Sequence, residues 1–417
     1  MAGYLFLLLS LVGVFLTGVV YRPVYHRPRR SVLTFFTGWL RGELAVHLLA
    51  VELLVTAGFI ALGALGNTAG WVGLGLSAIQ WAALAHAWRE GLGADRVVEA
   101  ALREGLGADY RAEIRPELAD RLVDRLEWDR VLRPFSFRRP GVRRARGIVF
   151  AREKGVNLRL DVYHCVERLT RAPVLLQIHG GGWVIGSKDE QGLIICNVLA
   201  SQGWVCVNAD YRLSPHATFP EHLIDLKKAI GWIKANIADF GGDPDYICVT
   251  GGSAGGHLAA MVGLTANDPE YQPGFEEVDT TVRACVPFYG IYDFADRNGV
   301  THKIGMDKLF ERQIMKGSRD EIPDAYERAS PIARVHPAAP PFMVIHGTRD
   351  SLASLADARH FVEALRKTSR APTVHVELPG AQHAFEIFHS PRALHAIHGV
   401  ARFLAWARSR YLAEREG

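Results

Sequence analysis

One short stretch near the middle of the chain, residues 246–260, restricts the possible folds more than any other. An apolar run suited to a strand leads into a glycine-flanked serine, and small residues suited to a helix follow it. A serine at a sharp strand-to-helix turn must adopt a sparsely allowed backbone conformation, and its neighbours must be small so that strand and helix can meet. The spacing of Gly251, Ser253 and Gly255 therefore indicates an exposed, nucleophilic Ser253.

The chain from residue 147 onward alternates between apolar runs and amphipathic stretches. Continuous apolar runs are typical of strands buried on both faces, and their alternation with helices indicates a mostly parallel sheet. We expect strands near 158–162, 174–178, 204–207, 247–249, 285–288, 342–345 and 374–378, and helices at 221–237, 256–265, 355–366 and 393–412. The predicted fold is α/β for residues 147–417, with a lid insertion near 293–330, where the alternation stops.

A run of three glycines follows the strand expected at 174–178. His179 precedes Gly180, Gly181 and Gly182, so the backbone can approach a ligand without side chains in the way. We expect the N–H groups of Gly181 and Gly182, with that of Ala254, to bind a negatively charged oxygen. His179 and Gly180 are expected to shape this loop.

Two further residues complete a possible catalytic set. Asp350 follows the strand expected at 342–345, and His383 lies on the loop after the strand expected at 374–378. Both positions are at carboxyl ends of strands, where α/β proteins build their sites. The chain order serine, aspartate, histidine predicts that His383 is the base and Asp350 its orienting acid. Asp357 is the alternative acid, although it falls inside the next expected helix.

These motifs together resemble the hormone-sensitive-lipase-like branch of the α/β-hydrolase superfamily over about residues 147–412. The resemblance rests on five segments in order, at 179–183, 210–215, 251–256, 346–350 and 383–385. It implies hydrolysis of carboxylic esters through an acyl-enzyme, by an esterase or lipase that uses neither a metal nor an organic cofactor. Gly252 departs from this branch, which usually has aspartate before the nucleophile.

Other functions fit the same residues. An amidase or deacetylase would use the same serine, histidine and aspartate, and a non-catalytic ligand-binding hydrolase fold is a third possibility. The complete set of three catalytic residue types argues against the last of these. Acyl chain length, the natural substrate and the oligomeric state are left open by the sequence.

The first 88 residues indicate a membrane region of about three transmembrane helices. Uncharged or nearly uncharged runs extend over 4–21, 44–65 and 68–88, and the first is long enough to cross a bilayer. The third run is the weakest, because alanine and glycine favour insertion only slightly. Glu52 and His47 interrupt the second run, and we interpret them as helix-to-helix hydrogen-bonding groups, with proton transfer as the alternative. A buried helical hairpin is the alternative for the whole region.

The distribution of arginine predicts the orientation in the membrane. Five arginines lie between the first two runs, namely Arg22, Arg27, Arg29, Arg30 and Arg41. The positive-inside rule places this segment in the cytoplasm. With three spans, the catalytic domain is then cytoplasmic, at a bacterial inner membrane. This inference fits the resemblance, which extends to membrane-anchored bacterial esterases.

Residues 89–146 are expected to form a polar, helical and basic linker. A helix is predicted for 116–132, and an arginine-rich segment follows it that either contacts anionic lipid or pairs with nearby acidic residues. The five scattered cysteines show no metal-ligand spacing, and a net charge of +4 is too small to indicate a nucleic-acid partner. The expected partners are therefore a small-molecule or lipid ester and membrane lipids.

Overall fold

An eight-stranded sheet lies at the centre of the protein, which a computed structural model describes over residues 1–25, 28–167, 169–300, 302 and 305–416. The strand order is β1-β2-β4-β3-β5-β6-β7-β8. β2 pairs antiparallel with β1 and β4, and the other neighbours are parallel. The strands are β1 (Val142–Glu153), β2 (Val156–Cys165), β3 (Ala172–Ile178), β4 (Val205–Ala209), β5 (Gly242–Gly252), β6 (Cys285–Phe288), β7 (Phe342–Gly347) and β8 (Thr373–Leu378).

Each strand expected from an apolar run is present in this sheet. All residues of β3, β4, β6 and β7 are buried, as expected for parallel strands covered on both faces. β1 is an additional strand, which lies at the sheet edge and mixes exposed arginines with half-buried residues. The predicted α/β-hydrolase architecture is therefore confirmed, with one more antiparallel strand.

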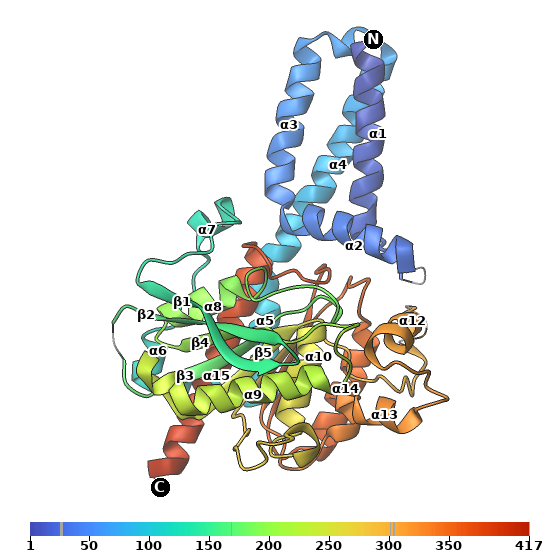
Figure 1. Cartoon of the computed structure of the whole chain (residues 1–417). Coiled ribbons are helices and arrows are strands. Elements are labelled where there is room, and N and C mark those ends of the chain that lie inside the picture. Colours follow the sequence, from blue (N-terminus) through green and yellow to red (C-terminus); the bar gives the residue numbers. More distant parts are fainter. Residues whose placement is uncertain (26–27, 168, 301, 303–304, 417) are drawn as a thin grey trace.

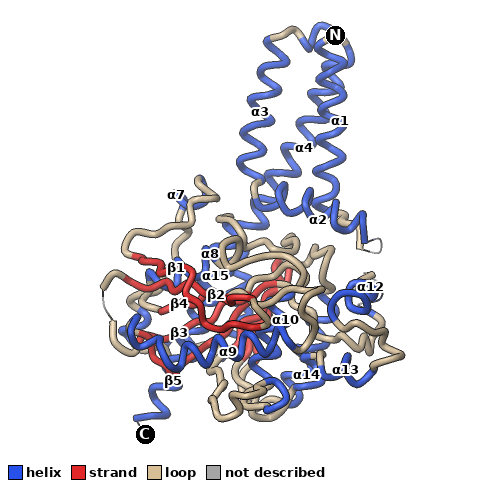
Figure 2. The backbone as a smooth tube through the Cα atoms, viewed as in Figure 1, coloured by secondary structure: helices blue, strands red, loops and turns tan. Residues whose placement is uncertain are grey.

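Helices cover both faces of the sheet (Figures 1 and 2). One face packs against α9 (Glu221–Asn236), α10 (Ala254–Leu264) and α14 (Leu355–Thr368). The other packs against α5 (Ala94–Leu106), α8 (Leu193–Ser201) and α15 (Pro391–Glu416). Short 3₁₀ turns η2 (Tyr110–Glu113), η3 (Ile237–Phe240) and η4 (Pro269–Tyr271) connect these elements.

The segment expected as a lid insertion folds into short helical pieces. They are α12 (Asp307–Leu309), the π-helical turn η5 (Phe310–Ile314), α13 (Pro323–Arg328) and the 3₁₀ turn η6 (Pro331–Arg334). Phe294 and Phe310 stack on each other and meet the ring of Trp183 edge-on, at 5.4 and 5.9 Å. The insertion therefore packs against the triple-glycine loop. Residues 301, 303 and 304 of this segment lie outside the described part.

The N-terminal helices form a stalk that stands on one side of the α/β body (Figure 1). α1 (Ala2–Tyr21), α3 (Ala45–Ala61) and α4 (Thr68–Leu92) run side by side, with the turn η1 (Ala64–Gly66) near the N-terminus. α2 (Pro28–Glu43) lies across the foot of the stalk. Its residues 30–43 make an angle of 85° with α3.

Only one described helix, α1, is long and apolar enough to cross a membrane alone. The bent pair of α2 and α3 would make a second candidate if it counted as one span. α4, expected as the third span, does not meet this standard, because Gln80 and several glycines and alanines dilute its apolar residues. α1 is compatible with a membrane anchor or with a signal sequence. Arg27 lies outside the described residues.

The single helix predicted for residues 116–132 is wrong. The structure has two short helices, α6 (Pro116–Ala119) and α7 (Trp128–Leu132), joined by irregular chain. Asp124 accepts hydrogen bonds from Arg111 at 2.9 Å and from Arg402 at 3.0 Å, which hold the chain away from a helical path. Aspartate is also a weak helix former in an interior position.

Much of the region expected as a linker is packed onto the body. Val98 and Leu102 of α5 are fully buried in the core that includes β8 and α15. β1 begins at Val142, before the change of pattern at residue 147. Arg139 pairs with Glu127, and Arg144 pairs with Asp161. Acidic side chains therefore neutralise part of the arginine-rich segment.

Candidate active site

Ser253 occupies the turn between β5 and α10. Its φ of +59° and ψ of −120° are strained for a residue with a side chain, as expected for a nucleophile held clear of its own backbone. Its N–H donates to Phe288 O at 3.0 Å. A Cβ on Gly255 would lie 2.2 Å from Ile178 O, so only glycine lets the helix approach β3 this closely. The sequence pattern therefore identifies a real strand-to-helix elbow.

Asp350 and His383 are hydrogen-bonded to each other. The distance from His383 Nδ1 to Asp350 Oδ2 is 2.7 Å, and both side chains are buried. Asp350 Oδ1 accepts the N–H groups of Leu352 and Ala353, each at 2.8 Å. These bonds fix the carboxylate on the loop after β7 and orient the imidazole on the loop after β8.

The surroundings of Asp350 favour its charged form. Burial opposes ionisation, but His383 and His346 outweigh it through charge and hydrogen bonding, so the pKa of Asp350 is lower than usual. Asp357, the alternative acid, instead accepts the N–H of Tyr292 at 2.7 Å inside α14. Burial raises the pKa of Asp357 to about 7. Asp357 thus serves the packing of a neighbouring loop.

The triple-glycine loop lies beside the serine. A Cβ on Gly180 would be 3.1 Å from Ser253 Cβ. Gly180 N–H donates to Gln191 Oε1 at 2.7 Å, whereas the N–H groups of Gly181 and Gly182 have no acceptor among the described residues. Both glycines have positive φ, +114° and +59°, a conformation that glycine adopts without strain. Two N–H groups without an acceptor among the described residues therefore lie on the loop that passes Ser253.

His179 stabilises this loop. Its Nδ1 bonds to Gly180 O at 2.7 Å, and its ring stacks on Tyr211 at 4.4 Å. Tyr211 O–H in turn donates to His179 O at 3.1 Å. Burial lowers the pKa of His179 to about 4, so the ring is neutral near pH 7. The segment 210–215 thus braces the glycine loop.

The elements that carry these side chains are joined by Tyr289, which the sequence did not single out. Its ring centroid lies 4.4 Å from that of His383. Its hydroxyl oxygen is 2.7 Å from the place a Cβ on Gly252 would take. In the described residues no hydrogen bond joins Ser253 Oγ to His383, and such bonds commonly tighten when substrate binds.

Comparison with known proteins agrees with this geometry. The family model described as BD-FAE matches residues 160–365. The probable carboxylic ester hydrolase LipM of Mycobacterium tuberculosis is 39% identical over 401 residues, which cover 92% of this chain and 89% of LipM. The chain belongs to this family of carboxylic ester hydrolases.

Two further proteins similar to this chain support its assignment as an esterase. LipC, an esterase of the same organism, is 47% identical over 247 residues, which cover 59% of this chain and 61% of LipC. A solved structure of a thermophilic esterase from Thermogutta terrifontis superposes with a TM-score of 0.53 at 25% identity, over 68% of this chain and 95% of that one. The resemblance to the hormone-sensitive-lipase-like branch is confirmed, and the protein is an enzyme that hydrolyses carboxylic esters.

A buried carboxyl group that the sequence analysis missed lies three residues after His383 in the esterase. Glu386 Oε1 accepts the hydroxyl of Tyr289. Although the residue is partly accessible, its Oε2 is enclosed and has no hydrogen-bond partner in the part of the chain described. Burial raises the pKa of Glu386 to about 7. Its only signal in the sequence is that it is an acidic residue between Phe385 and Ile387.

α2 forms part of the surroundings of His383 in the esterase. The ring of Phe35 meets His383 edge-on, at a centroid distance of 6.0 Å. Ser31 O accepts the hydroxyl of Ser351, the residue after Asp350, at 3.2 Å. This contact could not be predicted from local patterns, because the partners are more than 300 residues apart.

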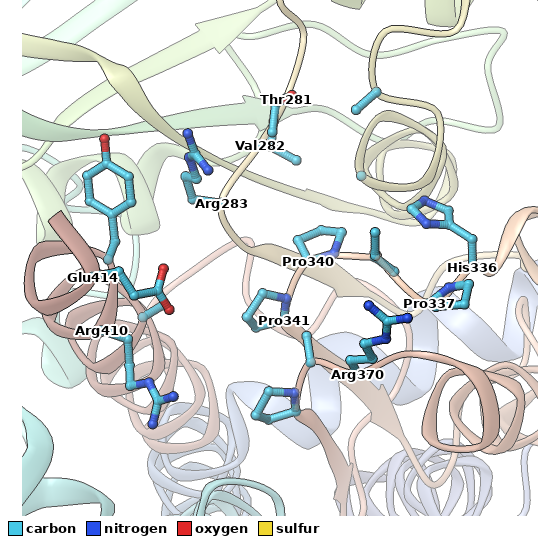
Figure 3. A pocket seen from close by; sticks show the side chains of 18 of the residues that line it. Thr281, Val282, Arg283, His336, Pro337, Pro340, Pro341, Arg370, Arg410 and Glu414 are labelled. Atoms are coloured by element: carbon cyan, nitrogen blue, oxygen red, sulfur yellow. The ribbon is translucent and has the colours of Figure 1, made fainter. Parts of the chain in front are cut away.

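A cleft of about 750 Å³ in the esterase lies away from these residues (Figure 3). Val282 and Pro341, which line it, come just before β6 and β7. The cleft is therefore at the amino ends of the strands, opposite the edge at which α/β proteins place their chemistry. None of Ser253, Asp350 and His383 lines it. The predicted site residues and this cleft therefore lie at opposite edges of the sheet.

Proposed function

We propose that this carboxylic ester hydrolase acts through an acyl-enzyme formed on Ser253. Ser253 Oγ attacks the ester carbonyl carbon while His383 Nε2 takes the hydroxyl proton. Asp350 holds the opposite edge of the ring and stabilises the imidazolium. The N–H groups of Gly181, Gly182 and Ala254 bind the oxyanion.

The second half of the proposed reaction returns the enzyme to its starting state. His383 protonates the leaving alcohol as the tetrahedral intermediate collapses. It then takes a proton from water, which attacks the acyl carbon, and the carboxylic acid leaves as Ser253 Oγ regains its proton. The pair of Asp350 and His383, 2.7 Å apart and joined to the Ser253 turn through Tyr289, is the observation that carries the proposal.

A fluorophosphonate probe, which labels activated serines, tests the assignment. Wild type should be labelled, and Ser253→Ala should not be; its turnover of a short soluble ester should fall roughly 10⁴–10⁶-fold. Ser201→Ala is the matched control, because this exposed serine of α8 bonds only within its own helix. Labelling that persists in Ser253→Ala would falsify the proposal.

We also propose that the stalk anchors the enzyme in a bacterial inner membrane. α1 has 20 residues, which span about 30 Å as a helix, the thickness of the hydrocarbon core. Residues 1–88 are the proposed membrane region and residues 147–417 the catalytic domain on its cytoplasmic side. The proposed substrates are small-molecule or lipid esters, and the proposed partners are the surrounding lipids.

A further inference from the structure

One side of α2 is fixed to the loops that carry the proposed catalytic residues. Phe35, 9% exposed, packs against His383, and Trp39 packs against Phe388 at 5.0 Å. At the end of the helix, Glu43 accepts the hydroxyl of Ser390 at 2.6 Å and pairs with the buried Arg392. α2 is therefore a rigid part of the active-site surroundings.

The opposite side of α2 is apolar and uncovered. Leu33 is 67% exposed, and its exposed apolar neighbours on the helix are Val32, Phe36 and Leu40. The spacing of Leu33, Phe36 and Leu40 places them on one helical face. A helix with apolar residues on both sides, one buried and one open, needs a second apolar environment to cover the open side.

A second exposed apolar group extends this surface. Trp128 and Leu132 of α7 and Phe135 just after it are exposed, Leu132 by 65%. In Figures 1 and 2, α7 projects from the body to the level of α2 at the foot of the stalk. Phe388 joins the two groups, because its ring lies 5.5 Å from Phe135 and 5.0 Å from Trp39.

We infer that these seven side chains form one surface that sits in the interfacial zone of the bilayer, and that the esterase takes bilayer-dissolved esters through it to Ser253. We name this surface the interface platform; its members are Val32, Leu33, Phe36, Leu40, Trp128, Leu132 and Phe135. The second part of the inference rests on the proposed function of Ser253.

Three observations select a lipid surface as the occupant. The platform continues directly from the foot of the apolar stalk, and α2 turns by 85° from α3, as a helix lying in the membrane plane would. Arg133 and Arg138, exposed beside Leu132 and Phe135, have no ion-pair partner among the described residues and suit anionic lipid heads. Tryptophan and arginine at this depth are typical of membrane interfaces.

The substrate class follows from the position of Phe35. Its ring lies next to that of Phe36 on the platform, at 4.8 Å, and also contacts His383. The catalytic histidine is thus one aromatic ring away from the inferred lipid surface. An ester whose acyl chain stays in the bilayer can then reach Ser253 without full transfer of that chain into water, which becomes less favourable with each additional CH₂.

An environment-sensitive fluorophore tests the surface itself. Cys165, the only partly exposed native cysteine, is first replaced in the full chain by Cys165→Ser. The fluorophore is then attached at Leu33→Cys or Leu132→Cys, and the protein is placed in phosphatidylcholine–phosphatidylglycerol vesicles. Lipids with brominated acyl chains should quench both labels. A label at Val156→Cys, an exposed apolar position on the β1–β2 hairpin, should not be quenched. The inference is overturned if the platform labels are not quenched. It is also overturned if light scattering shows that the labels become covered only when the protein forms dimers.

A comparison of two substrates tests the route to the site. Leu33→Asp with Leu132→Asp should lower turnover of a long-chain ester dissolved in the vesicles about tenfold or more. In this double variant, turnover of a short soluble ester and fluorophosphonate labelling should stay near wild type. In the control Val156→Asp, turnover of the long-chain ester, turnover of the short ester and labelling should all stay near wild type. Equal loss on both substrates, or no loss on either, contradicts the route. Lack of labelling in wild type would instead contradict the role of Ser253, while the quenching result would still decide the platform.

Discussion

Individual backbone conformations matter most at the triple-glycine loop. Gly181 and Gly182 both have positive φ, but only one of them is crowded. A Cβ on Gly181 would lie 2.0 Å from Ile185 O, whereas the nearest atoms to a Cβ on Gly182 are 3.9 Å away. The two positions therefore separate the effect of close packing from the effect of backbone strain.

Gly181→Ala should damage the proposed oxyanion site more than Gly182→Ala. The added methyl group must push the chain at residue 185 away and displace the Gly181 N–H, and losing one such donor costs about 10²–10³-fold in turnover. Gly182→Ala should lose clearly less, because it meets only strain. Steady-state kinetics on a soluble ester, with melting curves for both variants, measure the difference. Equal turnover in the two variants would show that displacement of the loop does not govern the reaction.

Glu386 makes stability depend on pH in a defined direction. The pKa of this carboxyl rises from 4.5 to about 7 on folding because it is buried, with the carboxyl of Glu43 adding to the shift. Tyr289 and His383 act in the opposite direction. Between these pH values the folded protein holds a proton that the unfolded chain has released. The free energy of unfolding therefore falls as the pH rises from about 4.5 to 7.

Glu386→Gln should remove this loss. Between pH 5 and pH 8 the free energy of unfolding should fall in wild type because of Glu386, and this contribution should be absent in the variant. The stability of the variant relative to wild type should therefore rise by roughly 1–3 kcal/mol over this range. Thermal unfolding of both proteins at the two pH values measures it, and Glu363→Gln, which changes an exposed carboxylate on α14, is the control. A variant whose melting temperature follows that of wild type at both pH values would show that Glu386 is already ionised in the fold.

At the scale of helices and strands, the sequence predicts the central elements well. The strands β3, β4, β6 and β7 are mostly apolar and buried throughout, and α9, α10, α14 and α15 lie within a few residues of their expected ends. These patterns are local, because burial on both faces of a sheet leaves a continuous record in one segment. The order of Ser253, Asp350 and His383 along the chain follows from the same elements.

The elements that the sequence did not predict depend on distant contacts. The sequence indicates only an arginine-rich segment between the first two apolar runs, yet α2 forms there, and its Phe35 and Trp39 pack on the loop after β8. Glu43 and Arg392 form an ion pair in which both side chains are buried. Neither residue alone indicates that its partner lies nearly 350 positions away. The helix predicted for residues 116–132 is wrong for the same reason, because Asp124 bonds to Arg402 of the distant helix α15.

At the scale of the whole molecule, the stalk and the body share an interface next to the proposed active site. Arg349, which precedes Asp350, bonds to Glu90 of α4 at 2.8 and 2.9 Å and lies over the ring of Tyr21. With the contacts of α2, this ties the proposed membrane helices to the loops that hold Asp350 and His383. A chain lacking residues 1–88 would expose Phe388, which packs against Trp39 of α2.

The arrangement of the stalk also predicts its orientation. The N-terminus and the η1 turn lie at the end far from the body, while α2 and the hydrolase domain lie at the near end (Figure 1). Arg22, Arg30 and Arg41 gather at the near end, with Arg89 and Arg96 beyond it, whereas Gly66 and Asn67 at the far turn carry no charge. By the positive-inside rule, we therefore expect the near end and the hydrolase domain to be cytoplasmic.

Reporter fusions at two positions test this orientation. A fusion after residue 146 would interrupt β1, which continues past that position. The reporters are therefore placed after Glu416, at the exposed end of α15, and at Asn67. A fluorescent protein after Glu416 should glow and alkaline phosphatase there should be inactive, because the phosphatase needs an oxidising compartment for its disulfides. Alkaline phosphatase inserted at Asn67 should be active. The opposite pattern would place the hydrolase domain outside the cytoplasm, and the bilayer leaflet that supplies the ester would then be the outer one.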